Sequence, residues 1–325
     1  MKRVTFMLLS LFFMGCSGAK QPEVLSYPSW YLNPPHNDGS SLYGVGEGVD
    51  LSSAKISALN AIAASLSVTV SSEFKKSESS SSFNGRENTY HSAINTLKAE
   101  VKEIEFGDYT VVQNLALSGR IILLVEVSRS RLFNAQKAKL EQFSKELRAE
   151  HANISRKSPL QQAFAYEQSM EKTQKLTALA LLAKSINSNF DTAPYIDQVA
   201  QIKQYQEDAL GNAKVSVTAD PEARVFVDAL KEGLNDAGIQ TVSSGANTHI
   251  HLQNSFQTDV IYGFTIVKAT LLLSTKDAQQ RNIATKTISL NGKSRYDAEK
   301  AKLSAAQSLS LKITQEGIYA LIGIQ

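Results

Sequence analysis

The 325-residue sequence has one cysteine, Cys16, and one tryptophan, Trp30. A single cysteine cannot form an internal disulfide, so the fold must depend on a buried apolar core. The 34 Lys and Arg residues nearly balance 31 Asp and Glu residues, for a net charge of +3, and no basic cluster marks a nucleic-acid-binding surface. Beyond residue 15, unbroken apolar runs such as residues 121–125 and 178–183 are far shorter than the roughly twenty residues of a membrane-spanning helix. We therefore expect no nucleic-acid partner and a chain body that lies beside a membrane rather than within it.

The chain also lacks short motifs that mark common catalytic sites. It has neither a Gly-x-Ser-x-Gly nucleophile elbow nor a His-Glu-x-x-His zinc motif. His249 and His251 would face the same way on a strand and could hold a metal with a third ligand. The nearest acid, Asp259, is not at partner spacing, so we interpret the pair as a solvated strand face. We predict no catalytic residue, no cofactor and no metal, and a protein that is not an enzyme.

The first residues have the order of an export signal. Two basic residues precede an apolar stretch at residues 4–14, and Gly15 and Cys16 follow at once. Residues 13–16 resemble the bacterial lipobox, whose final cysteine is acylated and becomes the mature N-terminus, although residues 13 and 14 are bulkier than usual. The alternatives are an ordinary cleaved signal and an uncleaved anchor with an incidental cysteine. We predict a signal peptide at residues 1–15 and a membrane attachment through lipid on Cys16.

The residues after the cysteine indicate a destination and a tether. Within the lipoprotein pattern, Ser17 in place of Asp implies transport to the outer membrane of a cell that has two membranes. Residues 16–35 contain several prolines, which fix φ and bias their predecessors toward extended backbone. We predict a lipidated, proline-rich tether at the outer membrane. The sequence does not decide between the periplasmic face and the surface face of that membrane.

The pattern of apolar residues predicts an α+β domain at residues 36–134. Ala54, Ala58 and Ile62 recur at helical spacing, whereas Leu66 and Val68 begin an alternation typical of a half-buried strand. The predicted elements are a strand at 42–45, a turn at 46–48, a helix from about residue 50, a strand at 66–74, a Ser-rich loop at 75–82, a helical or mixed segment at 90–101, and two strands at 107–117 and 120–127.

Two further regions follow. Strand signals vanish at residues 135–210, where Pro159 and Pro194 stand at predicted helix starts, positions that tolerate proline because the first N–H has no partner. Residues 211–325 predict strands at 214–218, 239–242, 248–256, 264–274 and 283–290, with helices after Pro221 and at 296–322. The fold class is therefore α+β, with two small α/β-type domains joined by a helical connector after a signal peptide and a tether.

Two segments resemble a known family. Residues 28–35 (PSWYLNPP) and 42–48 (LYGVGEG), followed by an alanine-rich helix that runs into 66–70 (LSVTV), are similar to the LPP-twenty family of outer-membrane lipoproteins, in its FlgP-related group. The resemblance covers about residues 28–135. It implies a non-enzymatic structural or assembly role in the cell envelope, and for some members a role in motility.

Two features within the resembling segments have alternative interpretations. Glycines 44, 46 and 48 could cradle a phosphate, but the third glycine of the G-x-G-x-x-G pattern is missing, so we predict a tight turn. Trp30 and Tyr31 could contact a partner or the membrane interface, whereas the alternative that we favour for Trp30 is a plug in the core of the first domain. The expected partners are envelope proteins or further copies of this chain.

A rival function involves the C-terminal domain. Residues 211–325 lie outside the resemblance and could belong to a periplasmic ligand-binding protein or enzyme. A deep pocket lined by convergent polar groups in that domain would favour this rival, and a flat or oligomeric surface would favour the structural role.

Overall fold

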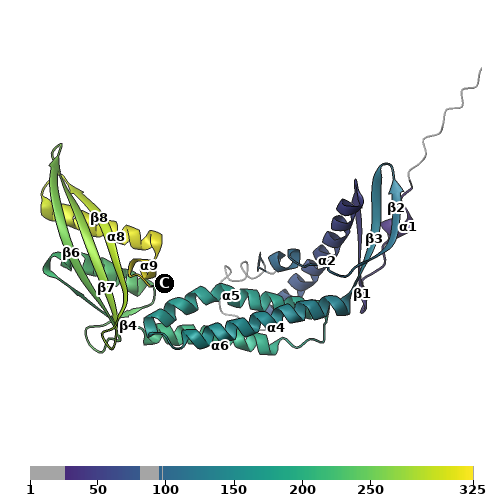
Figure 1. Ribbon diagram of the computed structural model, residues 1–325, viewed down its shortest axis with the longest axis horizontal. Helices are drawn as coiled ribbons and strands as arrows, with labels where there is room; N and C mark the ends of the chain where they lie inside the picture. The colour runs from purple at the N-terminus through teal and green to yellow at the C-terminus, as the bar shows by residue number, and fades with distance from the viewer. Residues whose placement is uncertain (1–25, 81–94, 97, 325) are drawn as a thin grey trace, which may run out of the picture.

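The computed structural model describes residues 26–80, 95, 96 and 98–324. Two arms rise on the same side of a central helical connector, with the N-terminal domain at one end and the C-terminal domain at the other (Figure 1). Cys16, Ser17 and the predicted signal peptide lie outside the described residues. The α+β fold class is confirmed, with one sheet in each arm.

The N-terminal arm is a three-stranded antiparallel sheet covered by a long helix. β1 (Ser41–Gly48) and β2 (Thr110–Leu117) both pair with β3 (Arg120–Ser128), which gives the order β1-β3-β2. Ser118 and Gly119 join β2 to β3 with positive φ at both residues, as a two-residue hairpin turn requires. α2 (Leu51–Ser80) lies across the sheet, and a short helix, α1 (Ser29–Leu32), precedes β1.

The glycines at 44, 46 and 48 are strand residues, so the predicted turn is wrong. They alternate with larger residues along β1 and share the face that meets α2. A β-carbon on Gly44 would stand 2.2 Å from the carbonyl oxygen of Ala58, and one on Gly48 would stand 2.4 Å from the amide nitrogen of Ala54. The glycines are therefore needed for close approach of helix and strand rather than for a special φ.

The predicted strand at residues 66–74 is also wrong, because α2 continues through it to Ser80. Leu66 and Val70 are four residues apart and extend the buried stripe begun by Ala54, Ala58 and Ile62, whereas Val68 is 69% exposed. The helix likewise replaces the predicted loop at 75–80, while residues 81 and 82 lie outside the described part. Of the mixed segment predicted at 90–101, the structure describes residues 95, 96 and 98–101, and all are helical.

One part of α2, Leu51–Ser72, is the one helix among the described residues that is long and apolar enough to cross a membrane. Lys55 is its only charged residue. Counting unbroken apolar runs missed this helix, because serines interrupt it. Its Ala54 and Ala58 side packs on β1, an arrangement that a core helix also has.

Three helices form the connector: α4 (Arg129–Ile154), α5 (Pro159–Ile186) and α6 (Ala193–Asn212). Pro159 occupies the first turn of α5, and the side chains of Ser158 and Gln161 form a capping box there. Pro194 takes the equivalent place in α6. The predicted helices are thus confirmed, and α4 follows β3 without a break.

The C-terminal arm is a five-stranded mixed sheet in the order β5-β4-β6-β7-β8. Its elements are β4 (Lys214–Ala219), a 3-10 turn η1 (Pro221–Phe226), α7 (Val227–Asp236), β5 (Gln240–Thr241), β6 (Thr248–Ile261), β7 (Phe264–Asp277), β8 (Asn282–Ser294), α8 (Ala298–Glu316) and α9 (Ile318–Leu321). β4 is parallel to its two neighbours, and the remaining pairs are antiparallel. The single helix predicted at 296–322 is broken at Gly317, where φ is +82°.

α5 belongs to the cores of both arms. Leu160 and Phe164, near its start, pack into the C-terminal core, whereas Leu181, Leu182 and Ile186, near its end, pack into the N-terminal core. The predicted boundaries at 134/135 and 210/211 stay a prediction, and the shared helix makes both end domains depend on the connector.

Candidate partner interface beside the tether

The last part of the tether predicted at residues 16–35 folds into a small aromatic helix, so the extended backbone predicted for this stretch is wrong at residues 29–32. Pro28 precedes α1, and its carbonyl oxygen accepts hydrogen bonds from the amides of Tyr31 and Leu32. The ring of Tyr31 stacks on Tyr27 with centroids 4.9 Å apart and meets the edge of Trp30 at 6.4 Å. Offset and edge-on pairs of this kind are favourable for aromatic rings. The three rings therefore form one cluster where the chain enters the domain.

α1 packs against β3 on the face of the sheet opposite α2. Side chains alternate along a strand, so Ile122 and Leu124 point away from Leu123 and Val125, which face α2. Ile122 and Leu124 are nevertheless almost fully buried. We infer that the aromatic cluster covers them, which gives the N-terminal sheet a second, smaller apolar layer.

A charged pair holds Tyr31 in place. Its hydroxyl donates to Glu47 Oε2 at 3.0 Å, and Arg120 Nη1 donates to Glu47 Oε1 at 2.8 Å. The hydrogen bond from Arg120 is the main cause that lowers the pKa of Glu47. Burial, and then the Glu47 carboxylate, raise the pKa of Tyr31. Glu47 thus stays ionised and Tyr31 stays neutral near neutral pH, the states in which this hydrogen bond forms.

Trp30 does not plug the main core, so the interpretation that we favoured from the sequence is wrong. It is half-buried and lies outside the cluster of buried residues between α2 and the sheet. Tyr31 is also half-buried, and Leu32 at the end of the helix is exposed. A hollow of about 360 Å³ adjoins the end of α1, lined by Leu32, Asn33, Pro34, Pro35, His36, Asn37, Tyr43 and Ser65. The partner contact predicted for Trp30 and Tyr31 stays a prediction, now with a defined surface.

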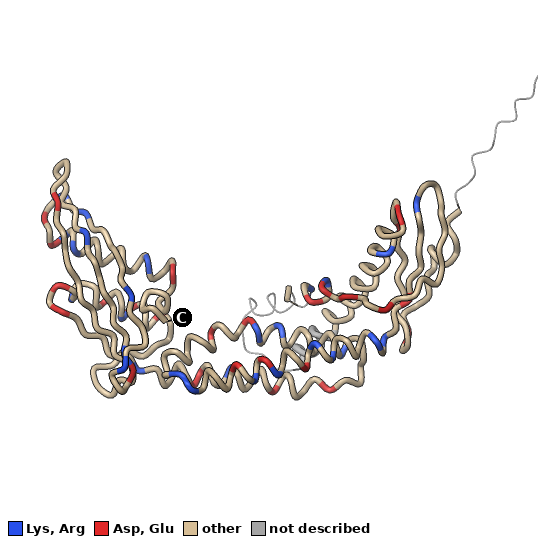
Figure 2. The backbone as a smooth tube through the Cα atoms, viewed as in Figure 1, with Lys and Arg blue, Asp and Glu red and all other residues tan. Residues whose placement is uncertain are grey.

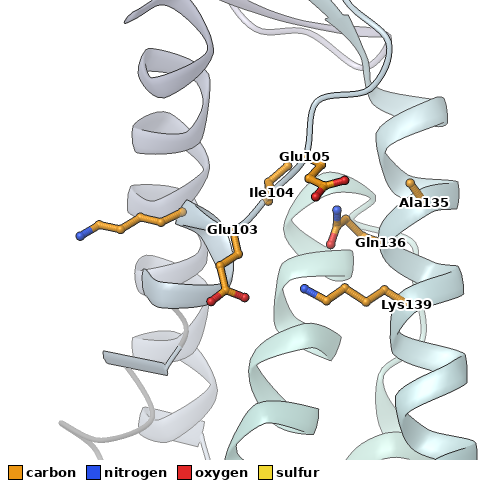
Figure 3. Close-up of a pocket in the computed structure, with 7 residues that line it drawn as sticks. Glu103, Ile104, Glu105, Ala135, Gln136 and Lys139 are labelled. Carbon is orange, nitrogen blue, oxygen red and sulfur yellow. The ribbon is translucent and has the colours of Figure 1, made fainter. Parts of the chain in front are cut away.

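A second hollow, of about 790 Å³, lies between residues 102–105 and α4. Glu105, Gln136 and Lys139 point into this space (Figure 3). Beside it, Glu100 is buried and pairs with Lys139 at 3.0 Å and with Lys175 at 2.9 Å. Those two ion pairs join the segment before β2 to α4 and α5, so the polar groups here have a structural use.

His249 and His251 do share a face of β6, as the sequence predicted. Each imidazole Nδ1 lies beside a hydroxyl of the parallel strand β4, 2.8 Å from Ser216 Oγ and 3.0 Å from Thr218 Oγ1. The carboxylate near His251 is Asp220, at 3.3 Å, rather than Asp259. Among the described residues no group of three His, Cys, Asp or Glu side chains could hold a metal ion.

Comparisons with known proteins found a family match in the N-terminal arm. A solved minor lipoprotein from Acinetobacter baumannii shares 14% identity with a TM-score of 0.29, covering 34% of this chain and 92% of that one. The secreted protein HP1454 from Helicobacter pylori shares 13% identity with a TM-score of 0.46, covering 85% of this chain and 97% of that one. Curated proteins gave no match. The family model of the LPP20 lipoproteins matches residues 28–128, from Pro28 to the end of β3, so the predicted resemblance to that family is confirmed over this part of the chain.

Proposed function

We propose that the protein is an outer-membrane lipoprotein, attached through lipid on Cys16, that acts as a structural or assembly component of the cell envelope. The family match supports a lipoprotein of the envelope. The observation that carries the finer proposal is the aromatic surface of α1, built at the junction between the tether and the LPP20 domain. The narrower role in motility rests on the family resemblance alone.

The position of α1 limits how far this surface can lie from the membrane. A chain spans at most about 3.3–3.6 Å per residue, so residues 16–28 can separate α1 from the lipid by no more than roughly 45 Å. Partners that are themselves held in or near the same membrane lie within that distance. We therefore assign α1 to contacts with envelope proteins or with further copies of this chain.

The chemistry of α1 is that of a protein-binding surface. Tyr and Trp are enriched at interfaces because each combines a large apolar ring with a polar tip. Stacking on Tyr27 and the hydrogen bond to Glu47 fix the ring of Tyr31 before any partner arrives. A surface ordered in advance loses less conformational entropy on binding.

The lipid anchor is tested at Cys16 itself. Cys16→Ala should abolish labelling by a clickable fatty acid and release the protein from the membrane fraction, because no other cysteine can accept the acyl chain. Ser17→Asp should move the protein from the outer to the inner membrane fraction. Continued labelling of the Cys16→Ala protein would refute the anchor.

The partner surface is tested by Trp30→Ala, with co-purification from membranes and thermal unfolding measured on the same protein. Loss of co-purifying envelope proteins at an unchanged melting temperature identifies Trp30 as a contact. A lowered melting temperature with partners retained would show that it only stabilises the domain. Val112→Ala, which removes an exposed apolar side chain from β2, is the matched control.

The rival function would place a ligand site or active site in residues 211–325. Both hollows described above are lined by residues between 32 and 139, and none of the described residues of the C-terminal domain gives an observation that favours the rival. A ligand-dependent thermal shift that survives the α1 substitutions would support it instead.

A further inference from the structure

The C-terminal arm ends in an exposed apolar point. β6 and β7 are joined by the two residues Tyr262 and Gly263 at the far end of this arm (Figure 1). Tyr262 is 96% exposed and Val260 is 74% exposed, and Ile261 beside them is also exposed. We call residues 260–264 the hairpin tip. Three large apolar side chains at the tip of one hairpin contribute nothing to the core of the domain.

The backbone at this point makes the tyrosine unfavourable for folding. φ is +51° at Tyr262 and +77° at Gly263, the left-handed region that hairpin turns of this type require and that Asn or Gly adopts most readily. A bulky side chain there is strained. The β2–β3 hairpin has the same turn, with φ of +51° at Ser118 and +76° at Gly119, but carries a small polar residue at the first position. An exposed tyrosine at a strained position indicates selection for something other than stability.

Two cations lie against the hairpin tip, and a third lies just past the end of the neighbouring strand β8. Lys293 Nζ lies 4.6 Å and the Arg295 guanidinium 4.8 Å from the ring centre of Phe264, and Lys300 Nζ lies 4.4 Å from that of Tyr296. None of these three cations forms an ion pair with a described carboxylate. Figure 2 shows Lys and Arg residues just below the tip of this arm, with Asp and Glu residues among them.

The acidic groups near the tip are mostly engaged elsewhere. Asp297 caps α8 by accepting from the amide of Lys300 at 2.7 Å, and Glu299 pairs with Lys302 at 2.7 Å. Asp259, on β6, is the remaining acid near the tip. The tip therefore combines exposed apolar side chains with cations whose charge is only partly offset.

We propose that the hairpin tip inserts into the interface of an anionic lipid bilayer and gives the protein a second membrane contact. Tyrosine at the headgroup level, aliphatic side chains below it and Lys or Arg beside it are typical of interfacial membrane binding. This inference depends on the proposed lipid anchor at Cys16 in one respect only, namely which membrane the hairpin tip contacts. The two arms rise on the same side of the connector, and the described chain begins beside α1 on the other arm (Figure 1), so one flat surface can meet both.

The shape of the tip favours lipid over a protein partner. A stable interface between proteins buries at least about 1,000 Å² over complementary surfaces, whereas three side chains on a narrow hairpin offer a small convex point. A bilayer interface needs no complementary shape, because lipids rearrange around an inserted side chain. An acyl chain on Cys16 would also raise the local concentration of lipid at the tip, so a weak contact would suffice.

The experiment uses the mature chain with Cys16→Ser, so that no attached lipid contributes. We expect it to co-sediment with vesicles of phosphatidylethanolamine and phosphatidylglycerol and much less with pure phosphatidylcholine, and salt should weaken the binding. Tyr262→Ser should lower the partition coefficient about tenfold, because one large apolar group no longer leaves water. The same variant should keep or raise the melting temperature, because Ser118 already shows that serine fits this turn. Leu311→Ser, which removes an exposed leucine from α8, should leave the partition unchanged.

A spectroscopic test follows from the single cysteine. In the Cys16→Ser protein, Tyr262→Cys creates one site for an environment-sensitive fluorophore, and Ala278→Cys creates the matched site in the exposed β7–β8 turn, at the opposite end of β7. The probe at 262 should shift to the blue on anionic vesicles while the probe at 278 does not.

Equal shifts at both sites, no vesicle binding by the Cys16→Ser protein, or unchanged binding by Tyr262→Ser would each overturn the proposal. Self-association in solution that Tyr262→Ser abolishes would assign the tip to a second copy instead. Vesicle binding by a protein whose Cys16 proves unlipidated would refute the anchor and leave the tip proposal intact.

Discussion

Gly46 and Ala58 bring strand β1 and helix α2 into backbone contact. A β-carbon on Gly46 would stand 2.2 Å from the amide nitrogen of Ala58 and 2.3 Å from the carbonyl oxygen of Ala54. The C-terminal arm has the same close contact between a strand and a helix. A β-carbon on Gly292 of β8 would stand 1.8 Å from the carbonyl oxygen of Ala301 in α8. Both sheets thus meet a helix through a glycine that faces alanines.

Gly46→Ala should destabilise the N-terminal arm. The added methyl group meets backbone atoms that cannot rotate away, and overpacking of this kind costs about 1–3 kcal/mol or more of the free energy of unfolding. Gly39→Ala is the control, because its β-carbon would meet nothing within 4 Å and its φ is not positive. Chemical denaturation of both variants measures the difference. An equal effect at the two positions would contradict the close contact.

We expect the two ends of α5 to stabilise the two arms independently, because each end packs into the core of a different arm. Leu160→Ala should loosen the C-terminal core and Leu182→Ala the N-terminal core, because each side chain is fully buried at its own end of the helix. Leu→Ala substitutions in cores cost about 2–5 kcal/mol. Hydrogen exchange, read separately for β7 and for β3, should show faster exchange in the arm that holds the substituted residue. Exchange that rises equally in both arms would mean that the molecule unfolds as one unit.

His151 should make the connector sensitive to mild acid. Its Nδ1 lies 2.5 Å from the hydroxyl of Tyr166, and its ring stacks on Tyr205 with centroids 4.2 Å apart, which joins α4, α5 and α6. Burial lowers the pKa of His151 below its usual value of about 6.5. The unfolded chain therefore takes up the proton first, so this contribution to stability is present above about pH 6.5 and is lost as the pH falls toward the folded-state pKa.

Thermal unfolding across this pH range measures the effect. His151→Gln should flatten the acid side of the stability curve, because glutamine keeps a hydrogen-bonding group but does not titrate. His36→Gln, at an exposed position, should leave the curve as it is. An unchanged slope in the His151→Gln protein would refute the assignment.

The sequence predicted local features well where one residue type decides them. Pro159 and Pro194 marked helix starts, Ser118 and Gly119 marked a hairpin, and the order of strands and helices in residues 211–325 was confirmed. These signals depend on φ and on hydrogen-bonding capacity within a few residues. The family motifs likewise located the segment that matches the LPP20 family model, and with it the aromatic residues of α1.

The wrong predictions came from residue patterns that are compatible with two different kinds of local structure. Leu66, Val68 and Val70 alternate like a strand, but Leu66 and Val70 are also four residues apart, and only the packing of α2 on the sheet decides between the two periods. Glycine serves turns and close contacts alike, so the sequence could not tell that β1 runs beneath α2. The Glu47–Arg120 ion pair joins residues that are distant in the chain, so no local sequence pattern could predict it.

Tyr319 should make stability depend on pH in the alkaline range, as His151 does in mild acid. Its ring is buried in α9 against Phe164 of α5, with centroids 5.0 Å apart, and its hydroxyl finds no hydrogen-bond partner among the described residues. Burial, with a smaller effect of the Glu167 carboxylate, raises the pKa of Tyr319 to about 12. The unfolded tyrosine ionises near pH 10, so stability that is present below about pH 10 is lost as the pH rises toward 12.

Tyr319→Phe should therefore stabilise the protein at neutral pH and more so in alkali. A buried hydroxyl without a partner costs about 1–3 kcal/mol, so its removal should raise the free energy of unfolding by about 1 kcal/mol, and phenylalanine keeps the packing on Phe164. The gain over the parent should be larger at about pH 11 than at about pH 8, because only the parent then loses stability through ionisation of this ring. Tyr296→Phe, at a tyrosine that is 80% exposed, should show neither effect. Urea unfolding of the parent and both variants at the two pH values measures the differences, and a destabilised Tyr319→Phe protein would mean that the hydroxyl has a partner after all.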